Sequence, residues 1–218
     1  MSPEPPAAFD RRKHQLSRQF VLIGTLAECV LGLIGLALAW LFSIPLRDHI
    51  QWNLAGVSKG LLATVPMLGV FCLVELAPGR TFQTLRTIVH MLIGTLVRSV
   101  GPAELALLSV AAGLSEEVFF RGFIQAGLQQ LLPEHGLVLG MPWESPVVAI
   151  VIAAILFGLA YSLSLSYTIL TTVLGIYLGT VFYATGNLLI PIVAHAVYDF
   201  IVLVYLAHVR RPRLGQGH

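Results

Sequence analysis

Long apolar runs separated by short polar breaks form the pattern of this 218-residue chain. In the first run, 20–42, only Thr25, Glu28 and a few small residues interrupt the apolar sequence. A helix of about 20 apolar residues spans the ~30 Å hydrocarbon core of a bilayer. The run is too long, and starts too far along the chain, for the apolar core of a signal peptide. It therefore predicts a membrane-spanning helix.

Six further apolar segments also predict helices. They cover residues 61–76, 88–100, 104–112, 147–162, 167–184 and 188–207. Proline and glycine mark the breaks between them, as at Pro78 with Gly79 and at Gly101 with Pro102. Because several segments are short, we expect the pieces on either side of Glu116 to form one long or broken helix. The pattern predicts an all-α, polytopic integral membrane bundle with six to eight transmembrane helices.

Composition agrees with a membrane protein, and the charge pattern adds an orientation. Hydrophobic residues make up 56% of the chain and charged residues 11%, whereas a soluble domain carries about a quarter charged residues. Basic residues gather near the two ends, at Arg11, Arg12, Lys13 and Arg18 and at Arg210, Arg211 and Arg213. The positive-inside rule then predicts cytoplasmic termini and an even number of crossings, with the plasma (inner) membrane as the expected location. We expect no nucleic-acid surface.

Two adjacent carboxylates and an arginine interrupt the apolar sequence of the second half, at Glu116, Glu117 and Arg121. Ionisable groups at membrane depth are costly and usually mark a function. On a helix Glu117 and Arg121 lie one above the other, so the guanidinium can neutralise that carboxylate. Glu116 points about 100° away around the helix and stays free. The cluster thus offers one structural carboxylate and one available base.

A second polar pair, His195 and Asp199, lies in the last apolar segment. The two residues are four apart, so on a helix they share a face. They could bind one metal ion, orient one water, or hydrogen-bond to each other. A lone intramembrane histidine often serves only as a hydrogen bond between helices. The presence of Asp199 four residues later, and of the Glu116 cluster elsewhere in the chain, favours a functional site.

Other polar residues favour plainer interpretations. Glu75 lies close to the proline break that ends its segment, where a wet interfacial carboxylate is expected. Glu28 lies deeper, and it is expected either to line a cavity or to pair with a basic residue of a neighbouring helix, with Lys59 and Arg98 as candidates.

These motifs resemble the CPBP intramembrane protease family, also called the Abi or type II CAAX prenyl endopeptidase-like family. The first family motif, EExxxR, is matched by Glu116, Glu117 and Arg121. The third, HxxxN or HxxxD, is matched by His195 and Asp199. The order, spacing and membrane context of the motifs make the joint match specific.

The second family motif, FxxxH, reads Phe157 to Tyr161 in this chain, within a resemblance that covers about 102–207. The resemblance implies a catalytic or metal-binding role for Glu116 and His195, and this role does not carry over to Tyr161. The ordinary pKa of tyrosine, near 10, keeps the phenol protonated, so Tyr161 cannot replace an imidazole as base or ligand. It can still donate a hydrogen bond to a water or an oxyanion.

The resemblance implies two mechanisms. In one, Glu116 activates a water while His195 and Asp199 stabilise the oxyanion; in the other, these three residues hold a divalent metal such as zinc. His90 is a conceivable replacement ligand, although its spacing does not support that role. The expected catalytic residues are Glu116, His195, Asp199 and Tyr161, with Glu117 and Arg121 as structural support.

The function implied by the resemblance is that of an intramembrane endopeptidase, or metalloprotease, which cleaves a membrane-associated protein or peptide. Tyr161 leaves open a second class, a catalytically impaired pseudo-protease that acts as a membrane scaffold or immunity-type binding protein. A proton-coupled transporter is disfavoured because no internal repeat is seen. The expected segments are a disordered basic tail 1–19, membrane helices 20–100, a catalytic core 101–209 and a basic tail 210–218.

Overall fold

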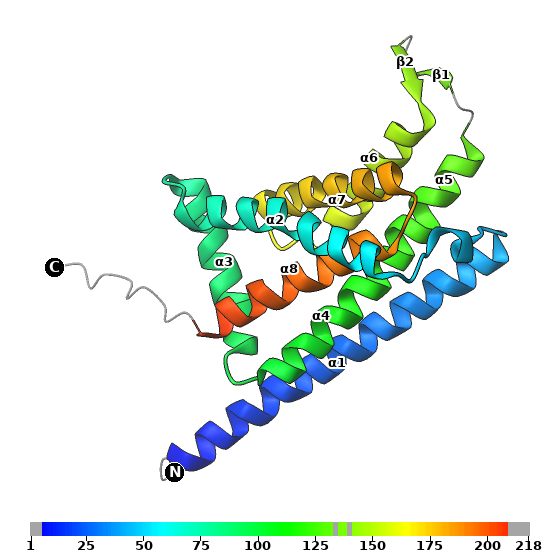
Figure 1. Ribbon diagram of the computed structural model, residues 1–218. Helices are drawn as coiled ribbons and strands as arrows, with labels where there is room; N and C mark the ends of the chain where they lie inside the picture. The colour runs from blue at the N-terminus through cyan, green and yellow to red at the C-terminus, as the bar shows by residue number, and fades with distance from the viewer. Residues whose placement is uncertain (1–5, 133–134, 139–140, 209–218) are drawn as a thin grey trace.

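The computed structural model describes residues 6–132, 135–138 and 141–208, and these residues form a helical bundle (Figure 1). The helices are α1 (Pro6–Leu41), α2 (Leu54–Leu76), α3 (Arg80–Val97), α4 (Pro102–Glu117), α5 (Ala126–Leu131), α6 (Ser145–Ala160), α7 (Leu165–Thr185) and α8 (Leu189–His208). A 3₁₀ turn, η1 (Leu46–His49), precedes α2. A short antiparallel hairpin, β1 (His135–Val138) and β2 (Met141–Glu144), lies between α5 and α6. The predicted all-α membrane class is confirmed.

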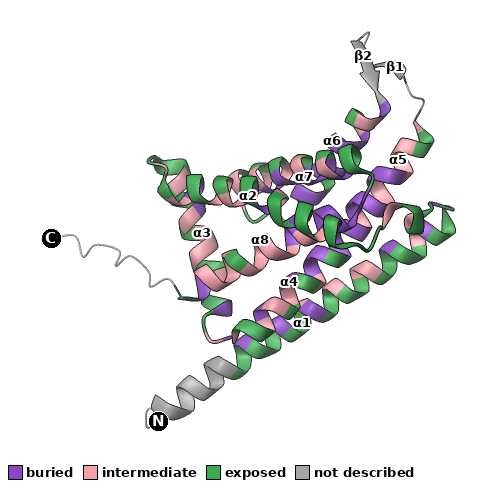
Figure 2. Cartoon of the chain, in the orientation of Figure 1, coloured by how far each residue is buried: buried purple, intermediate pink, exposed green. Residues whose placement is uncertain are grey.

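Four helices are long and apolar enough to cross a membrane by length and composition. They are residues 15–41 of α1 together with α2, α7 and α8. The α3 helix and the helix formed by Pro102–Leu131 pass the same test as one pair, bent by 118°. By this test the described residues hold four candidate spans, or five if the bent pair is one span, which is fewer than the predicted six to eight; α6 is a shorter apolar helix. The outer faces of α1 and α2 are exposed (Figure 2), as lipid-facing surfaces are.

The expected disordered tail over 1–19 is wrong for the residues that the structure describes. The first helix begins at Pro6 and runs for 36 residues. Proline is favoured in the first turn of a helix, and the alanine, arginine, lysine, glutamine and leucine that follow are good helix formers. Helix propagation from the membrane segment therefore continues back to Pro6. Residues 1–5 and the expected basic tail 210–218 lie outside the described residues.

The predicted long helix around Glu116 is present and carries a widened turn. It starts at a cap in which the Gly101 N–H donates to Oε2 of Glu104 over 2.8 Å. From α4 it continues through a π-helical segment, η2 (Val118–Gln125), into α5. Such π segments are rare and are often found at functional sites. Here the segment begins directly after the paired carboxylates.

Close helix contacts fix α4 between α1 and α8 (Figure 1). A Cβ added at Gly32 of α1 would lie 2.7 Å from Oγ of Ser115. On the opposite side, a Cβ at Gly113 would lie 2.7 Å from the backbone nitrogen of Ala196 in α8. Small residues at such positions let membrane helices approach closely. The second contact lies one residue from His195, so it sets how near α8 comes to the carboxylates of α4.

Candidate active site

A cavity of about 340 Å³ lies among the membrane helices. Its wall is mostly apolar, with side chains from α1, α2, α3, α4, α7 and α8. Among the polar residues that line it are Glu28, Glu116, Tyr161, His195 and Asp199. The structure therefore brings together the four residues that the sequence proposed as catalytic, and it adds Glu28.

Glu116 is the penultimate residue of α4 and is 2% exposed. Its Oε1 accepts a hydrogen bond from the hydroxyl of Tyr161, the residue that follows α6. Its Oε2 is buried and has no hydrogen-bond partner among the described residues. This oxygen lies 3.8 Å from Nε2 of His195. A carboxylate oxygen is thus left free to bind a water beside an imidazole.

A chain of polar contacts orients the ring of His195. Its Nδ1 lies 2.9 Å from Oε1 of Glu117, and because a carboxylate only accepts, Nδ1 donates. Arg121 donates to the same oxygen over 2.8 Å and to the carbonyl of Gly175 over 3.0 Å. The guanidinium also lies over the ring of Phe157, 4.8 Å from its centroid. Arg121 therefore neutralises Glu117 from behind, while Nε2 of His195 faces the cavity.

Asp199 completes the polar end of the cavity, one helical turn after His195. Its Oδ2 lies 3.5 Å from Nε2 of His195. The imidazole nitrogen therefore faces two carboxylates, those of Glu116 and Asp199, and a water beside them can hydrogen-bond to these groups.

Glu116, His195 and Asp199 are also the candidate metal ligands. Within the described ranges, no group of three or more His, Cys, Asp or Glu side chains is arranged so that it could hold a metal ion. The other candidate ligand, His90, bonds instead to Oε1 of Glu75 over 3.1 Å.

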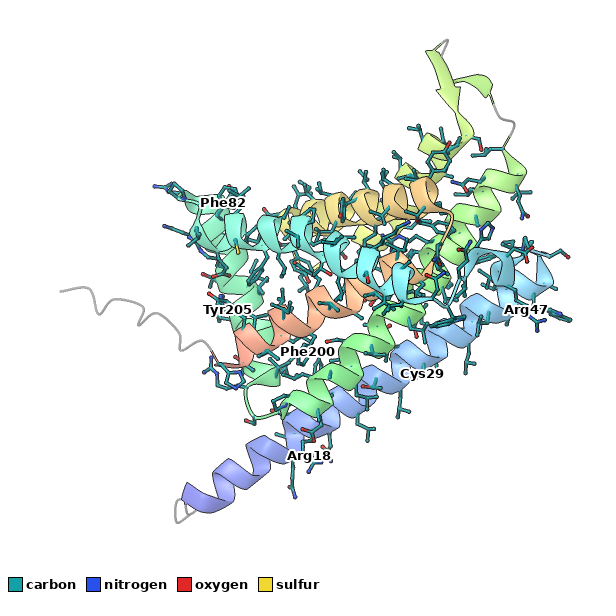
Figure 3. All side chains as sticks on the ribbon, in the orientation of Figure 1. Arg18, Cys29, Arg47, Phe82, Phe200 and Tyr205 are labelled. Atoms are coloured by element: carbon teal, nitrogen blue, oxygen red, sulfur yellow. The ribbon has the colours of Figure 1, made fainter. Side chains whose placement is uncertain are left out.

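Glu28 is the site residue to which the sequence gave no firm role. In the described part of the chain no ion pair joins it to Lys59 or Arg98, and its Oε2 is buried without a hydrogen-bond partner. The next residue, Cys29, is exposed on α1 (Figure 3). In the sequence, the indication of a role for Glu28 was its place as a single carboxylate deep in an apolar run. The site residues nearest to it in charge interaction, His195 and Asp199, lie on α8, and no sequence spacing reveals that proximity.

Glu75 lies one residue before the end of α2, as the sequence predicted, but its side chain is only 15% exposed and lines the cavity, so it is not the expected wet interfacial carboxylate. Besides His90, it accepts a hydrogen bond from the hydroxyl of Tyr205 over 3.3 Å (Figure 3 labels Tyr205 on α8). Arg86 donates to the backbone carbonyls of Val74, Glu75 and Ala77 at the end of α2. This network closes the end of α2 against α3 and α8.

The comparison with protein families assigns the same region. Residues 98–201 match the model of the type II CAAX prenyl endopeptidase Rce1-like family, which confirms the resemblance drawn from the motifs. The match contains Glu116, Glu117, Arg121, Tyr161, His195 and Asp199. It does not include α1 or α2. No curated protein and no solved structure matches the chain.

Proposed function

Residues 98–201 belong to the type II CAAX prenyl endopeptidase Rce1-like family, and from that premise we propose that this integral membrane protein is an intramembrane endopeptidase. Its substrate is a membrane-associated protein or peptide. One observation carries the proposal: Oε2 of Glu116, buried and unpartnered, faces Nε2 of His195 across 3.8 Å. A water seated beside the pair, on the cavity side, can hydrogen-bond to both atoms.

Glu116 acts on this water as general base. The carboxylate takes one proton as the water oxygen forms a bond to the scissile carbonyl carbon. The same proton then passes from Glu116 to the amine nitrogen as the carbon–nitrogen bond breaks. Water, peptide and proton balance without any further reactant.

His195 stabilises the charge that develops on the carbonyl oxygen. As an imidazolium it donates through Nδ1 to Glu117 and presents Nε2 to the cavity, where the oxyanion forms. Preorganised donors of this kind often account for the largest share of rate enhancement. Asp199, 3.5 Å from Nε2, holds the ring in this orientation.

Tyr161 replaces the histidine of the second family motif, and its role here is to position the base. Its hydroxyl donates to Oε1 of Glu116, which leaves Oε2 as the oxygen available to water. The competing form of the proposal places a zinc ion on Glu116, His195 and Asp199. The metal content of the purified protein distinguishes the two forms.

The test is a cleavage screen against membrane-anchored peptides, combined with metal analysis. The intact chain should cleave, and Glu116→Ala and His195→Ala should each abolish cleavage without loss of folded protein, because each removes a group that the transition state needs. Glu75→Gln, in the same cavity wall, is the matched control and should remain active.

A scaffold function is the second candidate, supported by the bond between Tyr161 and Glu116, which occupies one oxygen of the base. Cellular function that persists in both alanine variants would overturn the protease proposal and favour this binding role.

A further inference from the structure

The first helix, outside the region matched by the family, supplies a carboxylate to the cavity. Gly24, Glu28 and Gly32 follow at intervals of four residues and so share one face of α1. A Cβ at Gly24 would lie 3.5 Å from Leu108 of α4, and one at Gly32 would lie 2.7 Å from Ser115. Close packing on both sides of Glu28 therefore fixes its position against the helix that carries the general base.

Glu28 faces the polar end of the cavity without a partner of its own. Its Oε2 is buried and accepts no hydrogen bond from the described residues. The carboxylate is near enough to His195 and Asp199 to interact with them electrostatically. Besides His195, the cavity wall contains the cation Arg86, which already donates to three carbonyls at the end of α2.

The site holds more carboxyl groups than cationic partners. The carboxyl groups are Glu28, Glu116, Glu117 and Asp199, and the cationic groups that face them are Arg121 and His195. Arg121 is committed to Glu117. A buried carboxylate without a partner is costly, and a cleft lined by one sign of charge attracts a ligand of the opposite sign.

We propose that Glu28 is a specificity-determining residue that binds the cationic side chain of a substrate lysine or arginine close to the scissile bond. The proposal rests on the proposed protease function, because it places the scissile carbonyl between Glu116 and His195. Glu28 lies beside that position, within reach of a long basic side chain one or two residues along an extended peptide, at about 3.3 Å per residue.

A binding measurement tests the proposal without depending on cleavage. In a Glu116→Gln background, two single-span peptides are compared that are identical except for lysine or norleucine, with the varied position moved stepwise along the peptide. At the preferred position the lysine peptide should bind about tenfold tighter, as expected for one charge-assisted hydrogen bond. Adding Glu28→Gln should bring the ratio of the two dissociation constants close to one.

Two further variants make the result decisive. Glu28→Lys should reverse the preference towards a glutamate peptide, whereas Glu75→Gln, elsewhere in the same cavity wall, should leave the lysine preference intact. In the active protein, Glu28→Gln should raise KM for the lysine peptide with little change in kcat. A ratio that is unchanged in folded Glu28→Gln protein would overturn the proposal. Absence of cleavage in the intact chain would instead contradict the protease function. The ratio of the two dissociation constants would still test whether Glu28 binds the lysine side chain.

Discussion

Tyr161 takes the place that the second family motif gives to histidine, and its hydroxyl donates to Glu116. Tyr161→Phe removes this donor and leaves Oε1 of the base without its orienting bond. We expect kcat to fall on the order of 10²-fold, as small misplacements of catalytic groups do. The measurement is steady-state cleavage beside the intact chain. Unchanged kcat in Tyr161→Phe would show that Tyr161 does not position the base.

The ion pair between Arg121 and Glu117, behind the site, stabilises the folded protein. Arg121 is 1% exposed and donates to Glu117, so Arg121→Met leaves a buried carboxylate without its cation. We expect a loss of about 3–5 kcal/mol in the free energy of unfolding, measured by denaturant titration in detergent. Arg47→Met, at an exposed arginine (Figure 3), is the matched control and should change little. Equal midpoints for both variants would contradict the structural role of Arg121.

The sequence predicted those site contacts that helical periodicity dictates. The pairs Glu117 with Arg121 and His195 with Asp199 are four residues apart, and both are in contact in the structure. The bond between Nδ1 of His195 and Glu117 joins residues 78 apart in the chain. Such contacts depend on how helices pack, which a single sequence does not encode in any spacing.

At the scale of elements, the approach of α4 to α8 determines whether base and imidazole meet. Gly113→Ala would place a Cβ 2.7 Å from the backbone nitrogen of Ala196, so the helices must separate. We expect a loss of about 1–3 kcal/mol in stability, as for other overpacked sites, and a fall in kcat as Glu116 moves away from His195. Thermal unfolding and cleavage of the same samples check both effects.

Gly69→Ala is the control for that substitution, since nothing lies within 4 Å of a Cβ at this position in α2. Its stability and activity should stay at the level of the intact chain. If Gly113→Ala behaves in the same way, the close contact does not hold the site together.

Helix positions followed from hydropathy, because each of the seven predicted apolar segments overlaps an observed helix. Helix boundaries were less predictable. The start of α1 at Pro6 depends on propagation into polar sequence, and the π segment after Glu117 changes no hydrophobic pattern. The hairpin between α5 and α6 gave no alternating pattern that would predict it.

At the scale of the whole molecule, the contacts between the start of α1 and the end of α8 bear on the membrane topology. Val21 near the start of the apolar part of α1 shares a hydrophobic cluster with Leu206 and Ala207 at the end of α8. The two ends therefore lie on one side of the bundle, and the positive-inside rule predicts that this side faces the cytoplasm. Reporter fusions at the N- and C-termini should both report the cytoplasm. Opposite locations would contradict an even number of crossings.

The most direct measurement of the central claim is kcat/KM for peptide hydrolysis by purified Glu116→Gln protein, compared with the intact chain and with Glu75→Gln at equal folded concentrations. The amide keeps the size of the side chain but cannot accept a proton from water. We expect kcat/KM to fall by about 10²–10⁴, the usual contribution of a general base, while Glu75→Gln stays near the intact value. A Glu116→Gln protein that hydrolyses peptide as fast as the intact chain would contradict the role of Glu116 as general base.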